Sequence, residues 1–409
     1  MKLTILDDKN KRNILRIEYL FLSKKDTQRH ATTRALLSYL LVMACKKYPN
    51  NALLCKALDR LYGAQVSVTN LESDNHLGLS FYMDFINPNS LNDNKYTFKD
   101  CVDIFKEIVY NPLIIDNHFD ELIFNQQQDE LYDNILSDLE DKGFQSYINA
   151  RALLYKHMGG YIDSDGALED VKKITNADLV KEYRHMIECD DLIIRVYGNL
   201  SDNDRALIDS YNDKICLNPR WEYKLPANII EKTDDYKGYE SYLRMAYYTG
   251  VFEIDKLESL ALSMLSRMLA GDATSLFFNE IREKRGLCYN IKCQYNSQTS
   301  FVTVACEHKK ENTKEIMELV DSIINDIKNN NFSDELMESA RALSINRMLK
   351  RYDSFTNNVI HKSKKLTYGI DYTIDDIISL YKKIKREDIV KAAKSLAPVL
   401  RYCFRGILE

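Results

Sequence analysis

The chain is poor in the residues that break or cross-link a fold. Its 409 residues include only 6 prolines, 13 glycines and one tryptophan, and no low-complexity linker interrupts them. The nine cysteines are odd in number and form no CxxC pair, so reduced, buried thiols are their expected state. Cys288 and Cys293 would lie on opposite faces of a strand over 287–293, which argues against a metal shared between them.

An excess of one charge and a long apolar run are also missing. The chain has 56 basic and 61 acidic residues and a net charge of −5, whereas a nucleic-acid-binding protein needs a clustered basic excess. The longest apolar stretch, 35–45, is interrupted by Ser38 and is too short to span a bilayer. The N-terminus becomes charged at Asp7 and has no apolar signal-peptide core. We therefore expect a cytoplasmic protein without a nucleic-acid or membrane partner.

The chain has no motif that would cut a peptide. The zinc motif HExxH and its inverse HxxEH place two histidines and a glutamate on one helical face, where zinc activates a water. No two of the seven histidines lie within five residues of each other, so neither motif exists. GxSxG, Walker A and GxGxxG motifs are absent too. Glu307-His308 stands at the end of a predicted strand without a second ligand nearby, and we interpret it as a surface pair.

An internal repeat is present. Residues 174–200 resemble 384–408, each with an amphipathic helix, a strand, a glycine and a closing leucine. Residues 61–84 resemble 284–307, with Gly63 matching Gly286. Two matches in the same order indicate two copies of one unit.

The repeat predicts the fold class and the domains. Each half shows strands, a helix, more strands, then helices and a final strand, which predicts an α+β fold. We expect two tandem homologous domains, each a mainly antiparallel sheet covered by helices. The proline-containing stretch 217–226 is the best boundary. It predicts an N-terminal domain over 1–216 and a C-terminal homologous domain over 227–409.

The segment NEIREKRGLCY, 279–289, is the most informative part of the chain. It predicts the end of a charged helix, a turn at Gly286 and the start of a strand. Arg282 and Tyr289 stand on either side of that turn, where a cation and a phenol hydroxyl can bind a peptide carbonyl as it gains negative charge. Two structural alternatives remain: Tyr289 packs in the core, or Arg282 is a solvated helix residue. Arg285, nearer the turn, is a competing candidate.

This segment and the two-copy layout resemble the inverzincin family, the insulinase- and pitrilysin-like metallopeptidases, in the branch of the mitochondrial processing peptidase. The family's LFxEIREKRGLAY segment matches Leu276, Phe277, Asn279 and Glu280, then 281–289. The resemblance covers essentially the whole chain. The words RALLSYLL and LDRLYGA resemble most the inactive YmfF-like subunits of bacterial heterodimers.

The resemblance also shows where the chain departs from active members. The positions expected for His-x-x-Glu-His hold approximately Leu36, Tyr39 and Leu40, none of which ligates zinc. The third ligand would come from the helix near 126–130, where Asp129 or Glu130 could supply only one oxygen. The resemblance therefore implies no metal in this chain and zinc in a partner.

The resemblance implies a non-catalytic subunit of a heterodimeric zinc endopeptidase that processes peptides. Arg282 would bind a carbonyl of the substrate backbone and Tyr289 would stabilise the oxyanion formed at the zinc of an HxxEH-bearing partner. Arg282 ranks above Arg285 because the seven-residue spacing from Tyr289 matches the family's pair. The alternatives are a purely structural or peptide-binding subunit, and a homodimer when the chain is alone.

Overall fold

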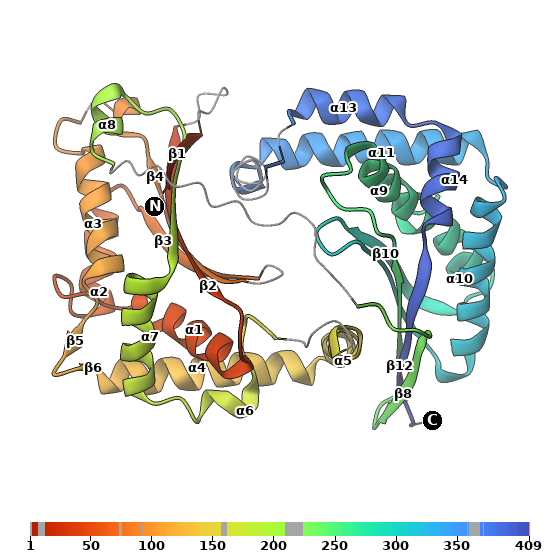
Figure 1. The fold of residues 1–409 in the computed structure, drawn as a ribbon, viewed down its shortest axis with the longest axis horizontal. Coiled ribbons are helices and arrows are strands. Elements are labelled where there is room, and N and C mark those ends of the chain that lie inside the picture. The colour runs from red at the N-terminus through yellow and green to blue at the C-terminus, as the bar shows by residue number, and fades with distance from the viewer. Residues whose placement is uncertain are drawn as a thin grey trace. The chain divides into compact units, whose positions relative to one another are not determined.

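The computed structural model describes residues 2–6, 13–72, 76–91, 93–156, 162–208, 224–357, 359, 369–370 and 372–408. Most of the predicted boundary stretch, 217–226, lies outside this set. The chain divides into two compact units, which are described separately (Figure 1). Unit 1 comprises Met1–Asp138 and Ile162–Cys216, and unit 2 comprises Leu139–Tyr161 and Leu217–Glu409.

Unit 1 is built on a five-stranded sheet in the order β1-β7-β2-β4-β3. β1 runs parallel to β7, and every other neighbouring pair is antiparallel. The strand β2 is buried along nearly its whole length, and Leu15, Ile17, Tyr19 and Phe21 lie on its core side. The strands of this sheet are β1 (Lys2–Leu6), β2 (Ile14–Lys24), β3 (Gln65–Glu72), β4 (His76–Ile86) and β7 (Asp191–Tyr197).

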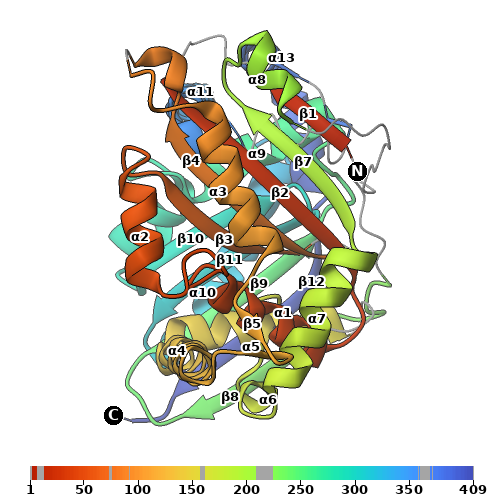
Figure 2. The same cartoon turned by 90° about the vertical axis from the view of Figure 1, so that its left-hand side faces the viewer.

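Helices cover one face of this sheet, and Figure 2 shows two of them, α3 and α7, lying across it. Both begin with a capping box, at Thr97 and Thr175, which satisfies free backbone N–H groups at the first turn. The helices of the unit are α1 (Gln28–Leu41), α2 (Asn51–Asp59), α3 (Phe98–Tyr110), α4 (Glu121–Glu140, which ends in unit 2), α6 (Leu168–Val171), α7 (Asn176–Cys189) and α8 (Asp202–Ala206), with the short strands β5 (Ile114–Ile115) and β6 (His118–Phe119).

Unit 2 repeats this topology. Its five-stranded sheet has the order β10-β11-β9-β12-β8, and only the β12–β8 pair is parallel. Read from the other edge, this is the strand order of unit 1. The strands are β8 (Ile230–Tyr236), β9 (Ser241–Tyr248), β10 (Cys288–Asn296), β11 (Phe301–His308) and β12 (Ala397–Gly406).

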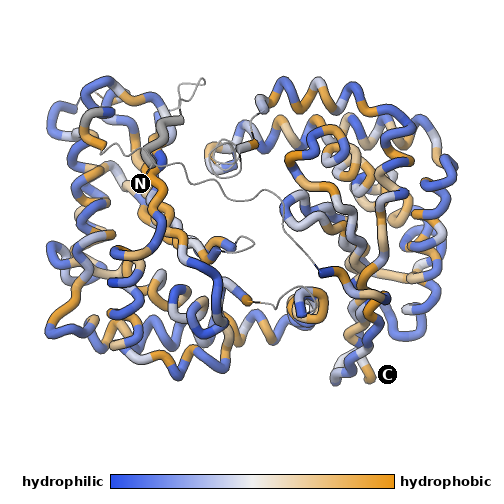
Figure 3. Tube along the Cα trace, viewed as in Figure 1, coloured by the Kyte–Doolittle hydropathy of each residue, from blue (hydrophilic) through white to orange (hydrophobic). Residues whose placement is uncertain are grey.

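The helices of unit 2 bury their apolar stripes on one face of the second sheet. Figure 3 shows polar and apolar residues alternating along these helices. Leu262, Val320 and Ile389, from three different helices, are fully buried in this core. The helices on this side are α9 (Lys256–Ala270), α10 (Thr313–Lys328), α11 (Asp334–Asp353), α13 (Ile374–Lys383) and α14 (Arg386–Lys394).

A further helix, α5 (Lys142–Lys156), packs on the opposite face of the second sheet. Ala150 and Leu154 lie against Ala246 and Phe404 in a separate apolar cluster. The Asn149 side-chain amide donates to the Tyr402 hydroxyl over 3.0 Å. This helix therefore belongs to the second unit although it precedes the last strand of the first unit in the sequence.

The predicted fold class is confirmed. The structure has two units with the same strand order, each a mainly antiparallel sheet covered by helices. The predicted glycine match is also visible, because Gly63 (φ +72°) and Gly286 (φ +63°) precede the equivalent strands β3 and β10. In the part of the chain that the structure describes, no helix combines the length and apolarity that a bilayer crossing requires.

The packing of α5 gives the first testable prediction. Leu154 is 6% exposed, so Leu154→Ala should lower the free energy of unfolding by roughly 2–5 kcal/mol. Hydrogen exchange should show the loss of protection in β9 and β12. The matched control is Leu122→Ala, at a site that is 67% exposed. Equal destabilisation by the two variants would show that α5 does not stabilise the second sheet.

Candidate functional site

Arg282 lies in a π-helical turn, Phe278–Glu283. The Lys284 N–H donates to the carbonyl of Asn279, five residues earlier, over 3.0 Å. Phe277 and Ile281 are fully buried and anchor the turn in the core of unit 2. Such wide turns inside helices are frequent at functional sites because they rotate the following side chains away from regular helical positions.

The turn ends at Gly286, as the sequence predicts. The Gly286 N–H donates to the Arg282 carbonyl, and the Leu287 N–H donates to the Ile281 carbonyl. Gly286 adopts the left-handed conformation that commonly closes a helix. The Asn312 side-chain amide donates to the Leu287 carbonyl over 2.9 Å and ties the turn to the start of α10. The Arg282 backbone and the start of β10 are thus held in a defined relation.

Tyr289 does not pack in the core. A bulge interrupts β10 at this point, because Cys288 pairs with His308 while Asn290 pairs with Glu307. Tyr289 is the extra residue, and a bulge of this kind changes the face on which the following side chains lie. Ile291 is therefore buried whereas Tyr289 is 56% exposed. The alternative that Tyr289 packs in the core is therefore wrong, because the bulge turns its side chain outward.

Arg282 is half exposed and rests on an aromatic ring. Its guanidinium carbon lies 4.6 Å from the centre of the Phe278 ring, a cation–π arrangement that limits the positions of the guanidinium. Its nearest carboxylate is that of the adjacent Glu283, at 3.7 Å. Arg285 instead faces α10, where it lies 3.6 Å from Glu315. Both ion pairs are exposed and weak, so the aromatic support distinguishes Arg282.

The turn places one cation and one phenol on an exposed surface. No hydrogen bond joins Arg282 to Tyr289, or the Tyr289 hydroxyl to another group, within the described residues. An incoming carbonyl would therefore not have to displace a protein partner of that hydroxyl. A guanidinium fork and a hydroxyl donor are suited to binding a polarised carbonyl or a tetrahedral oxyanion.

The positions expected for zinc ligands lie in the core of unit 1. Leu36 is fully buried, Leu40 is 3% exposed, and both belong to the hydrophobic core. The hydroxyl of Tyr39 accepts a hydrogen bond from the Asn134 side chain of α4. These three side chains offer no nitrogen, thiolate or carboxylate to a metal.

The carboxylates of the expected third-ligand region point to solvent. Asp129 is ion-paired with Lys172, and Glu130 is exposed. Throughout the ranges that the structure describes, no group of three His, Cys, Asp or Glu residues is arranged to hold a metal. The residues present do not fit a zinc ion, so no step of catalysis by this chain is derived through one.

The interpretation of Glu307-His308 as a surface pair is wrong for the histidine. His308 is fully buried, and its Nδ1 lies 2.7 Å from the Ser241 carbonyl. Burial lowers the pKa of His308, so the ring is neutral and Nδ1 is the nitrogen that donates. The residue joins β11 to the first residue of β9 and is structural.

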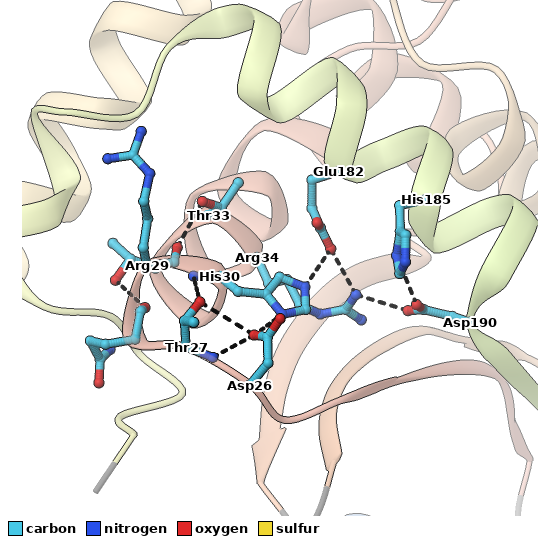
Figure 4. Close-up of polar contacts among 11 residues, drawn as sticks. Asp26, Thr27, Arg29, His30, Thr33, Arg34, Glu182, His185 and Asp190 are labelled. Carbon is cyan, nitrogen blue, oxygen red and sulfur yellow. Dashed lines mark hydrogen bonds and ion pairs between the residues drawn. The ribbon is translucent and has the colours of Figure 1, made fainter. Parts of the chain in front are cut away.

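Unit 1 contains a charged cluster that sequence reasoning missed (Figure 4). Arg34 is 2% exposed, and its Nη1 lies 2.9 Å from Glu182 and 2.8 Å from Asp190. His30, one helical turn earlier on α1, contacts the same Glu182 oxygen over 3.1 Å. His185 lies 3.5 Å from Asp190. No sequence pattern signals this cluster, because its two halves are about 150 residues apart.

The contacts identify the cluster as an internal connection between α1 and the end of α7. A hydrogen bond to Glu182 raises the pKa of His30, against the effect of burial, and Asp26 adds to the rise. Burial raises the pKa of Glu182, but His30 and Arg34 outweigh it and leave a net lowering. Since Glu182 and Asp190 both lie within ion-pair distance of the buried Arg34, the cluster is better suited to holding two helices together than to binding a ligand.

The buried arginine gives a stability prediction. Arg34→Ala leaves two buried carboxylates without their main cation, and breaking such a pair typically costs ~3–5 kcal/mol. Chemical denaturation should show that loss in the free energy of unfolding. Arg29→Ala is the control, because its partner Asp178 is 40% exposed and exposed pairs contribute about 1 kcal/mol or less. A similar small loss for both variants would contradict the structural role.

The histidine of the cluster gives a pH prediction. Since the folded pKa of His30 is raised, its stabilising effect is complete below the unfolded value of about 6.5 and is lost as the pH rises through the folded value. His30→Gln should therefore lower the free energy of unfolding more at about pH 6 than at about pH 9. The exposed His118, which contacts only the Asp116 carbonyl, is the control site. An equal loss at both pH values would refute the charged state of His30.

Comparison with known proteins found two sequence matches. A family model described as "Peptidase M16 inactive domain" matches residues 173–344. A relative from Bacillus subtilis (strain 168), named "Probable inactive metalloprotease YmfF", is 24% identical over 390 residues, which cover 93% of this chain and 90% of the relative.

Solved structures share the fold at low sequence identity. A conserved protein from Enterococcus faecalis V583 aligns over 100% of this chain and 96% of its own, with a TM-score of 0.90 and 21% identity. A protease from Helicobacter pylori aligns over 98% of this chain and 96% of its own, with a TM-score of 0.76 and 11% identity. At these identities the structural matches establish the fold alone. The two sequence matches confirm the predicted resemblance: the chain is similar to the M16 peptidases and, over nearly its whole length, to an inactive YmfF-like relative.

Proposed function

We propose that this chain is the zinc-less subunit of a heterodimeric zinc endopeptidase and supplies Arg282 and Tyr289 to the partner's active site. The observation that carries the proposal is the exposed tyrosine at the β10 bulge. A bulge that turns a large aromatic residue out of the core removes the stabilisation that its burial would give. That arrangement is understandable if the hydroxyl has a task at the surface.

Each of the two residues has a separate role in this proposal. Arg282, supported by the Phe278 ring, binds a backbone carbonyl of the peptide and holds it in register. Tyr289 donates a hydrogen bond to the oxygen of the scissile carbonyl as it becomes an oxyanion. The zinc and the attacking water belong to a homologous partner with an HxxEH helix, since Leu36 and Leu40 occupy the equivalent positions here.

The same proposal assigns the partners, the cellular location and the domains of the chain. The partners are an HxxEH subunit of similar length and a peptide substrate, in the cytoplasm, without nucleic acid or membrane. The peptide would bind in extended form, because main-chain hydrogen bonding tolerates varied sequences. The two peptidase-like domains would comprise residues 1–216 and 227–409, with the Arg/Tyr segment in the second. A homodimer remains the alternative when the partner is absent.

The competing function is a structural or peptide-binding subunit without a catalytic contribution. The full burial of Leu36 and Leu40 is equally compatible with it. The exposed Arg282 and Tyr289 favour the catalytic proposal, because a scaffold has no need for a bulge that exposes an aromatic residue beside a cation. An inactive but stable complex with the HxxEH subunit would support the structural function instead.

The proposal predicts the kinetics of a reconstituted complex. With a purified HxxEH partner and a fluorogenic peptide, Tyr289→Phe should lower turnover by ~10²–10³ because one oxyanion donor is lost. Arg282→Ala should lower kcat/KM roughly 10- to 100-fold, the range for a hydrogen bond to a charged group. Complex formation, measured by analytical ultracentrifugation, should be unaffected in both variants.

Two substitutions serve as matched controls. Arg285→Ala removes a neighbouring arginine that faces Glu315, and Tyr239→Phe removes a hydroxyl from another exposed tyrosine of unit 2. Both complexes should cleave the peptide at the wild-type rate. If Arg282→Ala and Tyr289→Phe also cleave at that rate, the catalytic assignment of the two residues is wrong.

A further inference from the structure

The bulge at Tyr289 also changes the position of Cys288. In a regular strand Cys288 and Cys293 would lie on opposite faces, and the sequence predicts that arrangement. The register shift between Cys288 and Asn290 reverses the alternation, and both cysteines lie in the same apolar core, 7% and 6% exposed. The prediction of opposite faces is therefore wrong, and Cys288 is turned inward where Tyr289 is turned outward.

On this face Cys288 meets a second thiol from the neighbouring strand. In the β10–β11 ladder, Cys288 pairs with His308 and Ile291 pairs with Cys306. Cys306 therefore lies two residues before the direct partner of Cys288 on β11. Cys306 is 3% exposed and belongs to the same core. The ladder places the two thiols on the same face in diagonal positions, and each shifts the pKa of the other. They are thus side-chain neighbours across the β10–β11 ladder, directly behind the bulge.

The surroundings of the two sulfurs shift their pKa values in opposite directions. The Cys306 thiol lowers the pKa of Cys288, burial opposes this effect, and the positive charge of Arg282 adds to the lowering. The pKa of Cys306 is raised by the Cys288 thiol and by burial. Cys288 is therefore the more acidic of the two thiols. A more acidic thiol beside a less acidic one is the arrangement of an attacking and a resolving cysteine.

We propose that Cys288 and Cys306 are an oxidation site that forms a disulfide between β10 and β11 in the presence of a hydroperoxide. The pairing rests on the bulged register and on the common burial of the two residues in one core. Other thiols of this core lack such a neighbour in the contacts described: burial alone raises the pKa of Cys293 to about 12.

The reaction uses hydrogen peroxide as the oxidant and balances without another reactant. The Cys288 thiolate attacks one peroxide oxygen, the O–O bond breaks, and Cys288 sulfenic acid and hydroxide form. The Cys306 sulfur then attacks the sulfenic sulfur, the S–O bond breaks, and the disulfide forms. The protons of the two thiols convert both departing hydroxide groups to water. Two thiols are oxidised to one disulfide, and one peroxide is reduced to two waters.

The disulfide would act on the proposed active-site residues, an extension that rests on the proposed function. Cys288 is the residue before Tyr289 and follows the turn that carries Arg282. Since a disulfide requires its two Cβ atoms to lie about 3.5–4.5 Å apart, it would fix the spacing of β10 and β11 directly beside the bulge. Oxidation should then reduce the ability of the chain to support cleavage by its partner.

The experiment treats the folded full-length chain with hydrogen peroxide and analyses non-reducing digests by mass spectrometry. We expect a peptide that links Cys288 to Cys306, with the loss of two hydrogen atoms and full recovery on reduction by dithiothreitol. In Cys306→Ala the sulfenic acid of Cys288 should persist and be trapped by dimedone. Cys293→Ala is the matched control from the same strand and should form the linked peptide as the wild type does.

The outcomes separate the two proposals. If Cys288 and Cys306 both remain free thiols in the folded chain, or if Cys288 links to other cysteines as readily, the oxidation site is refuted. In the reconstituted complex, peroxide should remove most of the activity of the wild type and of Cys293→Ala, but dithiothreitol should restore it. A linked peptide without an active complex would refute only the proposed function. A linked peptide with unchanged activity would refute only the regulatory extension.

Discussion

The site in unit 2 depends on one irregularity, the extra residue in β10. The helix before it ends at Gly286, and the strand after it pairs regularly with β11 from Asn290 onward. Between them Cys288 is turned into the core and Tyr289 out of it. The backbone hydrogen bonds that continue on both sides of the bulge hold this arrangement. Exposure of the tyrosine and the inward position of Cys288 are therefore consequences of the same bulge, while the π-helical turn before Gly286 places Arg282 on Phe278.

The two repeats share one topology but differ in which side chains they bury and which they expose. Unit 1 has the same strand order as unit 2, and its first helix buries Leu36 and Leu40 in the core. The same helix carries Arg34 and His30, which join it to α7 through buried ion pairs. The helix α1, with its apolar residues and internal ion pairs, serves packing, whereas the turn before β10 in unit 2 presents groups to solvent.

The sequence predicts the regular features and misses the irregular ones. The α+β class and the two copies follow from alternation, helical periodicity and the Gly63–Gly286 match, all of which are local signals. The exposure of Tyr289 could not follow from alternation, because one inserted residue reverses the faces and leaves no mark in the pattern. The packing of α5 on the second sheet was not visible either, since an amphipathic helix does not specify its partner. His308 looks polar in the sequence, yet one hydrogen bond to Ser241 allows its burial.

A structure of the heterodimer with an uncleaved peptide tests directly whether Tyr289 acts in the partner's active site. The informative quantity is the distance from the Tyr289 hydroxyl to the oxygen of the scissile carbonyl at the partner's zinc. The account predicts a hydrogen-bond distance, about 2.5–3.0 Å, with the Arg282 guanidinium on a neighbouring backbone carbonyl. A Tyr289 hydroxyl that lies outside the partner's active site, with the peptide held by other residues, would contradict it.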